Sequence, residues 1–256
     1  MRYVRFLRDG APRHGVIEQD NILELEGPGY AKAKFTGKSF PLNDVRLLSP
    51  VMPGKVIGVG LNYLDHITEL NHHVPTEPVI FLKPTSSVIG TYSHIIYPGN
   101  STRVDYEAEL AVVIGEVARH VAPETALRKV WGYTCGNDVT ARDLQARDGQ
   151  WTRAKSFDTF CPLGPWVETE LKPDGLEIIA RVNGEVRQRS HTSKMIFDVA
   201  HLVAFISEVM TLNPGDVILT GTPSGVGQLQ VGDEICVEIE GIGVLKNDVI
   251  DMGKGK

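Results

Sequence analysis

Short apolar runs that follow one another without regularly alternating helices constrain the fold of this chain most. After residue 54 the runs are "VIGVG", "PVIFLK", "AELAVVIG", "GPWVET", "EIIARV", "DVILTG", "DEICVEIE" and "GVLKNDVI". β-Branched and apolar residues bounded by glycine or proline indicate strands. A doubly wound parallel sheet requires strands that alternate with helices, which this pattern does not provide. We therefore expect a β-rich α+β fold built on antiparallel or mixed sheets.

Turn and cap signals add detail to this expectation. Asn183-Gly184 separates "IIARV" from "EVRQRS" and predicts a β-hairpin. Asp198 is a candidate N-cap for a helix in "DVAHLVAFISEVM", whose apolar residues follow helical spacing. A second, shorter helix is expected in "PETALRKVW", with Ala126, Leu127 and Val130 on one side.

The first 50 residues differ from the rest of the chain. They contain the short strand-like pieces "YVRFL", "HGVIE" and "NILELEG", separated by the turn signals Asp9-Gly10 and Gly27-Pro28. Pro50 and Pro53-Gly54 then interrupt the sequence. We expect a small N-terminal strand-rich domain at residues 1–50 and a larger domain at residues 51–256.

Composition excludes several classes of partner. The 256 residues carry a formal net charge of -6, which argues against nucleic acid and anionic membranes as partners. The sequence has no apolar run near the ~20 residues of a membrane span and no apolar segment of a secretory signal at its start. Its cysteines, Cys135, Cys161 and Cys236, are widely separated. This usage predicts a reducing cytoplasm and no thiolate zinc site.

Three carboxylates are candidates for a metal site. Glu107 and Glu109 stand two residues apart at the start of the run "LAVVIG", so on a strand both side chains point to one face. Alone, the pair is also typical of a solvated strand end. Asp138, however, follows the strand-like run "VWGYTCGN". Three carboxylates form a hard-oxygen site that suits Mg²⁺ or Mn²⁺ and leaves about three positions open for water or substrate.

The stretch "GLNYLDHITEL" places His66 and Glu69 three residues apart. On a short helix they are neighbours, and the carboxylate can then orient the imidazole as a general base. Taken alone, such a pair is more often surface decoration. In the polar loop that follows, we expect His72 and His73 to face solvent.

Basic residues lie near the acids in the sequence. Lys155 stands between two apolar segments in "WTRAKSFDTFCPLGPW", and Arg142, Arg147 and Arg153 precede it. A buried lysine requires an anionic partner, which is either a structural aspartate or the developing charge on a substrate oxygen. The glycine-rich stretch "GDVILTGTPSGVG" lacks the ending of a P-loop. It is either a plain turn or a turn whose N–H groups and Thr222 hydroxyl bind a ligand carboxylate.

Taken together, these motifs resemble the fumarylacetoacetate hydrolase family. The stretches that carry the resemblance occur in family order over about residues 54–250: "GLNYLDHITE", "PVIFLKP", "DYEAELAVVIG", "GYTCGNDVTARDLQ", "WTRAKSFDTFCPLGPWV", "VNGEVRQ" and "GDVILTGTPSGVG". The resemblance implies a rolled mixed β-sheet, a homodimer, and a Mg²⁺ or Mn²⁺ ion bound by Glu107, Glu109 and Asp138.

The resemblance also assigns roles around the ion. It implies that His66 and Glu69 lie on a lid and act with Lys155 in catalysis, while Arg142, Gln145 and Thr222 bind substrate. Some members that act on acylpyruvates carry arginine before the asparagine of "GxNY", where this chain has Leu61. The resemblance therefore does not select one particular substrate.

Our leading expectation is a Mg²⁺- or Mn²⁺-dependent hydrolase that cleaves a C–C bond in acylpyruvate-type 2,4-dioxo acids through a metal-stabilised enolate. The alternative keeps the site but changes the reaction to isomerisation or decarboxylation of 2-oxo dioic acids, such as oxaloacetate or 2-hydroxyhepta-2,4-diene-1,7-dioate, in aromatic catabolism. Hydrolysis needs a water activated by His66, whereas the alternative needs only the enolate. A non-catalytic metal-stabilised dicarboxylate-binding protein is a more distant possibility, because it would not need His66, Glu69 and Lys155.

Overall fold

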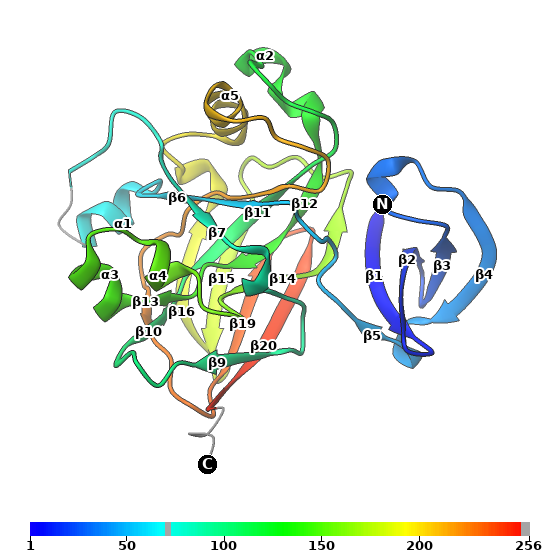
Figure 1. The fold of residues 1–256 in the computed structure, drawn as a ribbon, viewed down its shortest axis with the longest axis horizontal. Coiled ribbons are helices and arrows are strands. Elements are labelled where there is room, and N and C mark those ends of the chain that lie inside the picture. The colour runs from blue at the N-terminus through cyan, green and yellow to red at the C-terminus, as the bar shows by residue number, and fades with distance from the viewer. Residues whose placement is uncertain (70–72, 252–256) are drawn as a thin grey trace.

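Three β-sheets dominate the computed structural model, which describes residues 1–69 and 73–251 (Figure 1). The sheets contain both antiparallel and parallel pairs, and helices are few and short. The expected β-rich α+β fold with mixed sheets is therefore confirmed.

The largest sheet has twelve strands in the described part of the chain. Its order is β4 (Phe35–Pro41), β3 (Asn21–Leu25), β2 (Ala11–Glu18), β1 (Arg2–Arg8), β14 (Cys161–Glu168), β12 (Val130–Asn137), β11 (Ala108–Ile114), β17 (Val217–Leu219), β6 (Val56–Gly60) and β7 (Val79–Lys83). Two short strands lie off this path: β5 (Arg46–Leu47) pairs with β1, and β8 (Val88–Ile89) pairs with β14.

Two smaller sheets complete the β structure. The five-stranded sheet has the order β16 (Glu185–His191), β15 (Glu177–Val182), β19 (Glu234–Ile239), β20 (Gly243–Asp251) and β9 (His94–Tyr97). The three-stranded sheet has the order β13 (Thr140–Ala141), β10 (Val104–Tyr106) and β18 (Gly227–Gln228). The main core includes Leu110 and Val112 of β11 together with Ile178 of β15 and Val237 of β19. Apolar residues of the large and five-stranded sheets thus share one core.

The helices are α1 (Leu64–Glu69), α2 (Pro123–Ala126), α3 (Arg142–Asp148), α4 (Thr152–Lys155) and α5 (Val199–Val209). The Asp198 side chain accepts a hydrogen bond from the His201 N–H at 2.8 Å, which confirms the predicted N-cap of α5. The shorter helix differs from expectation. It ends at Ala126, a 3₁₀ turn follows, and Leu127 is 43% exposed, so the predicted apolar side is wrong at this residue.

The predicted hairpin joins β15 to β16. Asn183 and Gly184 both have positive φ, 52° and 82°, as a two-residue hairpin turn requires. None of the described helices is long and apolar enough to span a membrane.

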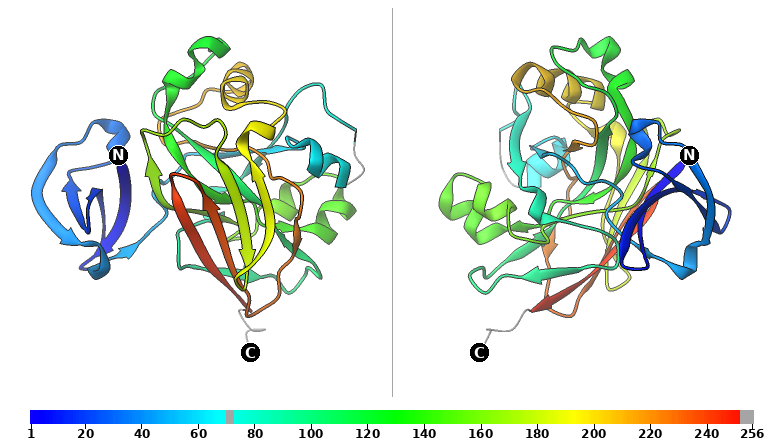
Figure 2. Two further views of the ribbon diagram at one scale, coloured as in Figure 1. Left: turned by 180° about the vertical axis from the view of Figure 1, so that it is seen from behind. Right: turned by 45° about the vertical axis from the view of Figure 1, so that its right-hand side comes forward.

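The N-terminal strands lie at one end of the molecule (Figure 2). They are not separate from the large sheet, because β1 pairs with β14 through Arg2↔Glu168 and Tyr3↔Val167. Tyr3 is 1% exposed and packs edge-on against Trp131 with 4.7 Å between ring centroids. The N-terminal strands therefore extend the large sheet and share part of its core.

Strand register brings distant residues to one edge of this sheet. In the antiparallel pair β11–β12, Ala108 lies opposite Asn137. Glu107, which precedes Ala108, and Asp138, which follows Asn137, are therefore at the same end of the pair. β17 flanks β11, and β6 lies parallel to β17. The segments that follow β6, β12 and β17 therefore converge where β11 begins.

Candidate active site

Three carboxylates converge at this edge. Glu107, Glu109 and Asp138 are each at most 4% exposed, and one oxygen from each lies within 4.8 Å of the others. The sequence predicted both glutamates at the start of a strand. In the structure the strand is interrupted there: β10 ends at Tyr106 and β11 begins at Ala108, so Glu107 occupies the break.

Side chains and backbone groups hold this break in place. Asn137 Oδ1 accepts a hydrogen bond from the Glu107 N–H at 3.0 Å, and the Glu107 carbonyl accepts one from the Asp138 N–H at 2.9 Å. Glu109 Oε2 accepts from the Gly221 N–H at 2.7 Å. The two glutamates are thus anchored to the neighbouring strands.

Two buried lysines contact the same aspartate. Lys83 Nζ donates to Asp138 Oδ1 at 2.5 Å, and Lys155 Nζ donates to Asp138 Oδ2 at 2.5 Å. Lys155 also donates to Glu107 Oε2 at 2.8 Å. Both side chains are at most 3% exposed. The carboxylates are therefore the anionic partner that a buried lysine requires.

Burial raises the pKa of both glutamates, but the neighbouring charges shift the two pKa values in opposite directions. Burial raises the pKa of Glu107, but the charges of Lys155 and Arg142 outweigh it and leave that pKa well below its usual range. Burial and the negative charges of Asp138 and Glu107 together raise the pKa of Glu109 well above its usual range. Burial lowers the pKa of Lys155, whereas Asp138 and Glu107 raise it more, so the ammonium stays protonated.

These residues fit a divalent cation. All three side chains offer hard oxygen ligands, which Mg²⁺ and Mn²⁺ prefer. Among the described residues Glu109 forms no ion pair, although it is buried beside two other acids. A cation bound to the three carboxylates would supply the counter-charge that Glu109 lacks.

His66 and Glu69 form a hydrogen-bonded pair on α1. His66 is 5% exposed, and its Nδ1 lies 3.1 Å from Glu69 Oε2. The Gly225 N–H donates to both Glu69 oxygens, at 3.0 and 3.2 Å. A neutral His66 that donates its Nδ1–H to Glu69 keeps a lone pair on Nε2, which a general base needs.

The segment before α1 is fixed by a buried asparagine. Asn62 Nδ2 donates to the carbonyls of Thr220 and Phe197 at 2.7 and 3.0 Å, and its Oδ1 accepts from the Phe197 N–H at 2.8 Å. These bonds tie the segment between β6 and α1 to two others, the one that precedes α5 and the one that follows β17.

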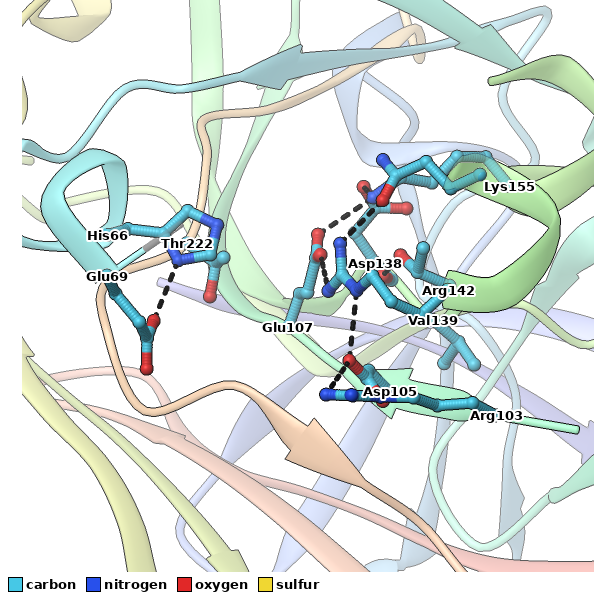
Figure 3. A network of polar contacts seen from close by, with 12 residues as sticks. His66, Glu69, Arg103, Asp105, Glu107, Asp138, Val139, Arg142, Lys155 and Thr222 are labelled. Carbon is cyan, nitrogen blue, oxygen red and sulfur yellow. Dashed lines mark hydrogen bonds and ion pairs between the residues drawn. The ribbon is translucent and has the colours of Figure 1, made fainter. Parts of the chain in front are cut away.

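Arg142 stands at the start of α3 and contacts three groups. Its guanidinium donates to Asp105 at 2.9 Å, to Gln145 Oε1 at 2.7 Å and to Glu107 Oε1 at 2.5 Å. Arg103 forms a second ion pair with the fully buried Asp105. Figure 3 shows His66 and Thr222 on one side of Glu107, and Asp138, Arg142 and Lys155 on the other.

The three carboxylates line a cleft of about 260 Å³ together with His66, Arg142, Gln145, Lys155 and Thr222. Its remaining wall is largely apolar and consists of Val59, Leu61, Phe81, Ala146 and Trp151, with Gly60 beside them. Gly60 is needed because a Cβ there would lie 2.5 Å from the Trp151 ring, and a Cβ at Gly58 would lie 2.2 Å from the Phe81 ring. The two glycines of β6 thus allow aromatic rings to pack directly on the strand.

The structure gathers the residues that the sequence singled out. The cleft is lined by His66, Glu107, Glu109, Asp138, Arg142, Gln145, Lys155 and Thr222, and Glu69 contacts His66 from outside the lining. Arg153 instead pairs with Asp148, and Arg147 also lies close to Asp148. His73 is exposed as expected, and His72 lies outside the described residues.

Sequence reasoning missed three buried residues of this cluster: Lys83, Asp105 and Gln188. Lys83 carried a usable signal, because it is a charged residue that ends an apolar strand-like run. Gln188 gave no local signal, since its partners lie on other elements. Asp105 has one local partner, Arg103, but its contact with Arg142 joins residues that are distant in the sequence.

Comparisons with known proteins agree with this geometry. The fumarylacetoacetate (FAA) hydrolase C-terminal family matches residues 55–250, and the Rv2993c-like N-terminal family matches residues 1–50. Oxaloacetate tautomerase Fahd2a, mitochondrial, of Rattus norvegicus is 48% identical over 222 residues, which cover 82% of this chain and 71% of that protein.

Two solved structures share the fold over nearly the whole chain. The 5-carboxymethyl-2-hydroxymuconate delta-isomerase of Mycobacterium smegmatis has a TM-score of 0.93 and 47% identity, covering 98% of this chain and 100% of that one. The 2-hydroxyhepta-2,4-diene-1,7-dioate isomerase of Mycobacterium marinum has a TM-score of 0.93 and 46% identity, covering 99% and 100%. Sequence, fold and the buried carboxylate cluster lead to one conclusion: the chain belongs to the fumarylacetoacetate hydrolase family.

Proposed function

We propose that this protein is a divalent-cation-dependent isomerase that interconverts keto and enol forms of 2-oxo acids. The observation that carries the proposal is the meeting, in one small cleft, of three carboxylates and a carboxylate-oriented histidine. The names of the relatives, a tautomerase and two isomerases, favour this reaction over the C–C hydrolysis that was our leading expectation.

Each residue has a task in this reaction. A divalent cation on Glu107, Glu109 and Asp138 would supply Lewis-acid polarisation of substrate oxygens. His66 Nε2 removes a proton from the carbon beside the keto group. The C–H electron pair forms a C=C bond, and the carbonyl π pair moves onto oxygen. Glu69 stabilises the resulting imidazolium, and His66 returns the proton to that oxygen to give the enol.

Two cations and a hydroxyl complete the cleft. The Lys155 ammonium lines the cleft and would neutralise the charge that develops on the substrate oxygen. Arg142, held by Asp105 and Gln145, is suited to bind the carboxylate end of the substrate. The Thr222 hydroxyl donates its one proton to the Ala108 carbonyl, so its part in the site is to hold the backbone beside the carboxylates. All three described cysteines are free thiols, which supports the proposed cytoplasmic location. The homodimer stays a prediction.

The test follows the conversion of enol to keto oxaloacetate by absorbance, with Mg²⁺ or with EDTA, and measures pyruvate in parallel incubations with acetylpyruvate. We expect Mg²⁺-dependent tautomerisation above the buffer rate and no pyruvate. Pyruvate and acetate from acetylpyruvate, with oxaloacetate tautomerising only at the buffer rate, would reinstate the hydrolase. Pyruvate and CO₂ from oxaloacetate would indicate a decarboxylase.

His66→Asn provides the matching variant. It removes the proposed base while leaving all three carboxylates, so we expect tautomerisation to fall by about 10²- to 10⁴-fold with Mn²⁺ binding unchanged. His73→Asn is the control, because His73 is exposed and lines no part of the cleft. A His66 variant with full activity would refute the assignment of the base.

A further inference from the structure

The peptide groups of Ala108 lie between the two glutamates and form hydrogen bonds to side chains. The Ala108 N–H donates to Gln188 Oε1 at 3.0 Å, and the Ala108 carbonyl accepts from the Thr222 hydroxyl at 2.9 Å. Ala108 is the first residue of β11, directly after the break at Glu107. Two side chains therefore fix the orientation of the peptide that separates the glutamates.

Gln188 reaches this peptide from another sheet. It belongs to β16, the edge strand of the five-stranded sheet, and is 1% exposed. Its Nε2 donates to the Thr222 hydroxyl and to the Pro223 carbonyl, each at 2.8 Å. The carboxamide thus uses one acceptor and two donors, a combination that only glutamine and asparagine provide.

The contacts close a ring. Ala108 N–H donates to Gln188, Gln188 donates to the Thr222 hydroxyl, and that hydroxyl donates back to the Ala108 carbonyl. The same hydroxyl lines the cleft, whereas Gln188 does not. A change at Gln188 would therefore reach the carboxylates through its three partners, Ala108, Thr222 and Pro223.

We propose that Gln188 is a positioning residue that sets the spacing of Glu107 and Glu109 for a divalent cation. The inference rests on the proposed metal site. Both glutamates are attached to the peptide groups that Gln188 and Thr222 orient, and binding of a small cation demands closely defined ligand positions. Groups that orient ligands in this way commonly change metal affinity when they are replaced.

Ser190 offers a matched control on the same strand. It is 2% exposed, lies two residues beyond Gln188 on the same face of β16, and its Oγ has no hydrogen-bond partner among the described residues. Ser190→Ala alters the buried face of β16 without touching Ala108 or Thr222.

The experiment titrates metal-free wild type, Gln188→Met and Ser190→Ala with Mn²⁺ and measures free Mn²⁺ by electron paramagnetic resonance. Methionine keeps the length and apolar volume of the side chain but removes every hydrogen bond. We expect Gln188→Met to bind Mn²⁺ about 10- to 100-fold more weakly, and Ser190→Ala to match wild type. Gln188→Asn, one methylene shorter, should also weaken binding and serves as a second folded variant.

The thermal unfolding of each variant, recorded without metal, separates positioning from stability. A merely structural role would lower the unfolding temperature and leave the Mn²⁺ affinity of the folded protein unchanged, which would overturn the proposal. If wild type itself binds no Mn²⁺, the proposed metal site fails, a result distinct from equal binding by wild type and Gln188→Met.

Discussion

Glu109 is the residue in which burial and the proposed metal site conflict most directly. It lies beside two other acids, accepts a hydrogen bond from a backbone N–H and has no cation partner among the described residues. A carboxylate of the proposed metal site must lack a cation partner of its own, because a carboxylate that is already neutralised would bind the ion poorly. The uncompensated buried charge should lower the free energy of unfolding of the metal-free protein.

We expect Glu109→Gln to stabilise the metal-free protein at neutral pH and to abolish Mn²⁺ binding. The pKa of Glu109 is raised in the folded state by burial and by Asp138 and Glu107. Above the usual value of 4.5, Glu109 therefore binds more protons in the folded state than in the unfolded state, and its contribution to stability falls as pH rises. The free energy of unfolding of Glu109→Gln should equal that of wild type near pH 4.5 and exceed it increasingly at higher pH.

Urea unfolding in EDTA at several pH values measures this advantage. Glu124→Gln, at an exposed glutamate of α2, controls for the general loss of a negative charge. A difference between Glu109→Gln and wild type that does not depend on pH would contradict the raised pKa.

At the scale of elements, the segment after β17 links the cleft to α1. Gly225 holds Glu69 through its N–H, and its carbonyl accepts from the Tyr106 hydroxyl at 3.0 Å. It has φ 94°, and a Cβ there would lie 2.3 Å from the Arg187 carbonyl oxygen. Both the backbone conformation and the available space therefore require glycine at this position.

Gly225→Ala should lower both stability and turnover. A positive φ costs a non-glycine residue about 1–2 kcal/mol, and the overlap with Arg187 adds about 1–3 kcal/mol. Gly232→Ala is the control: its φ is 98°, but nothing lies within 4 Å of the added Cβ. We expect it to show only the smaller loss of stability in urea and an unchanged kcat. Equal kcat values for the two variants would show that distortion of the backbone at Gly225 does not disturb the pair of Glu69 and His66.

Features formed by neighbours in the chain could be predicted from the sequence, whereas contacts between distant elements could not. Strand runs, the Asn183-Gly184 turn and the Asp198 cap are local, so the residues that determine them are neighbours in the chain. The carboxylate site was predictable because its motifs are distinctive. Gln188 was not, because its role depends on how β16 packs beside β11, which no periodicity within either strand encodes.

Over the whole molecule, the N-terminal strands are joined to the rest by pairing and by packing. Tyr3 contacts Trp131 and shares a core cluster with Ala111 and Val217 of the large sheet. The division at residue 50 that the sequence suggests therefore does not coincide with a break in the sheet.

Tyr3→Ala should lower the free energy of unfolding by about 3 kcal/mol, because it removes a buried aromatic ring. We expect one cooperative transition and unchanged Mn²⁺ affinity, since Tyr3 lines no part of the cleft. Phe35→Ala, which removes a 57% exposed ring from β4, is the control. Two separate transitions in Tyr3→Ala, followed by circular dichroism during urea unfolding, would show that the N-terminal strands unfold independently.

The contact between Gly60 and Trp151 has a consequence for how such clefts diverge. Because any side chain at position 60 collides with the indole, substitutions at the two positions are not independent. Evolution toward a differently shaped substrate must shrink residue 151 before residue 60 can grow. The order of the two mutations is then fixed, and a homologue with alanine at position 60 should carry a smaller residue opposite it.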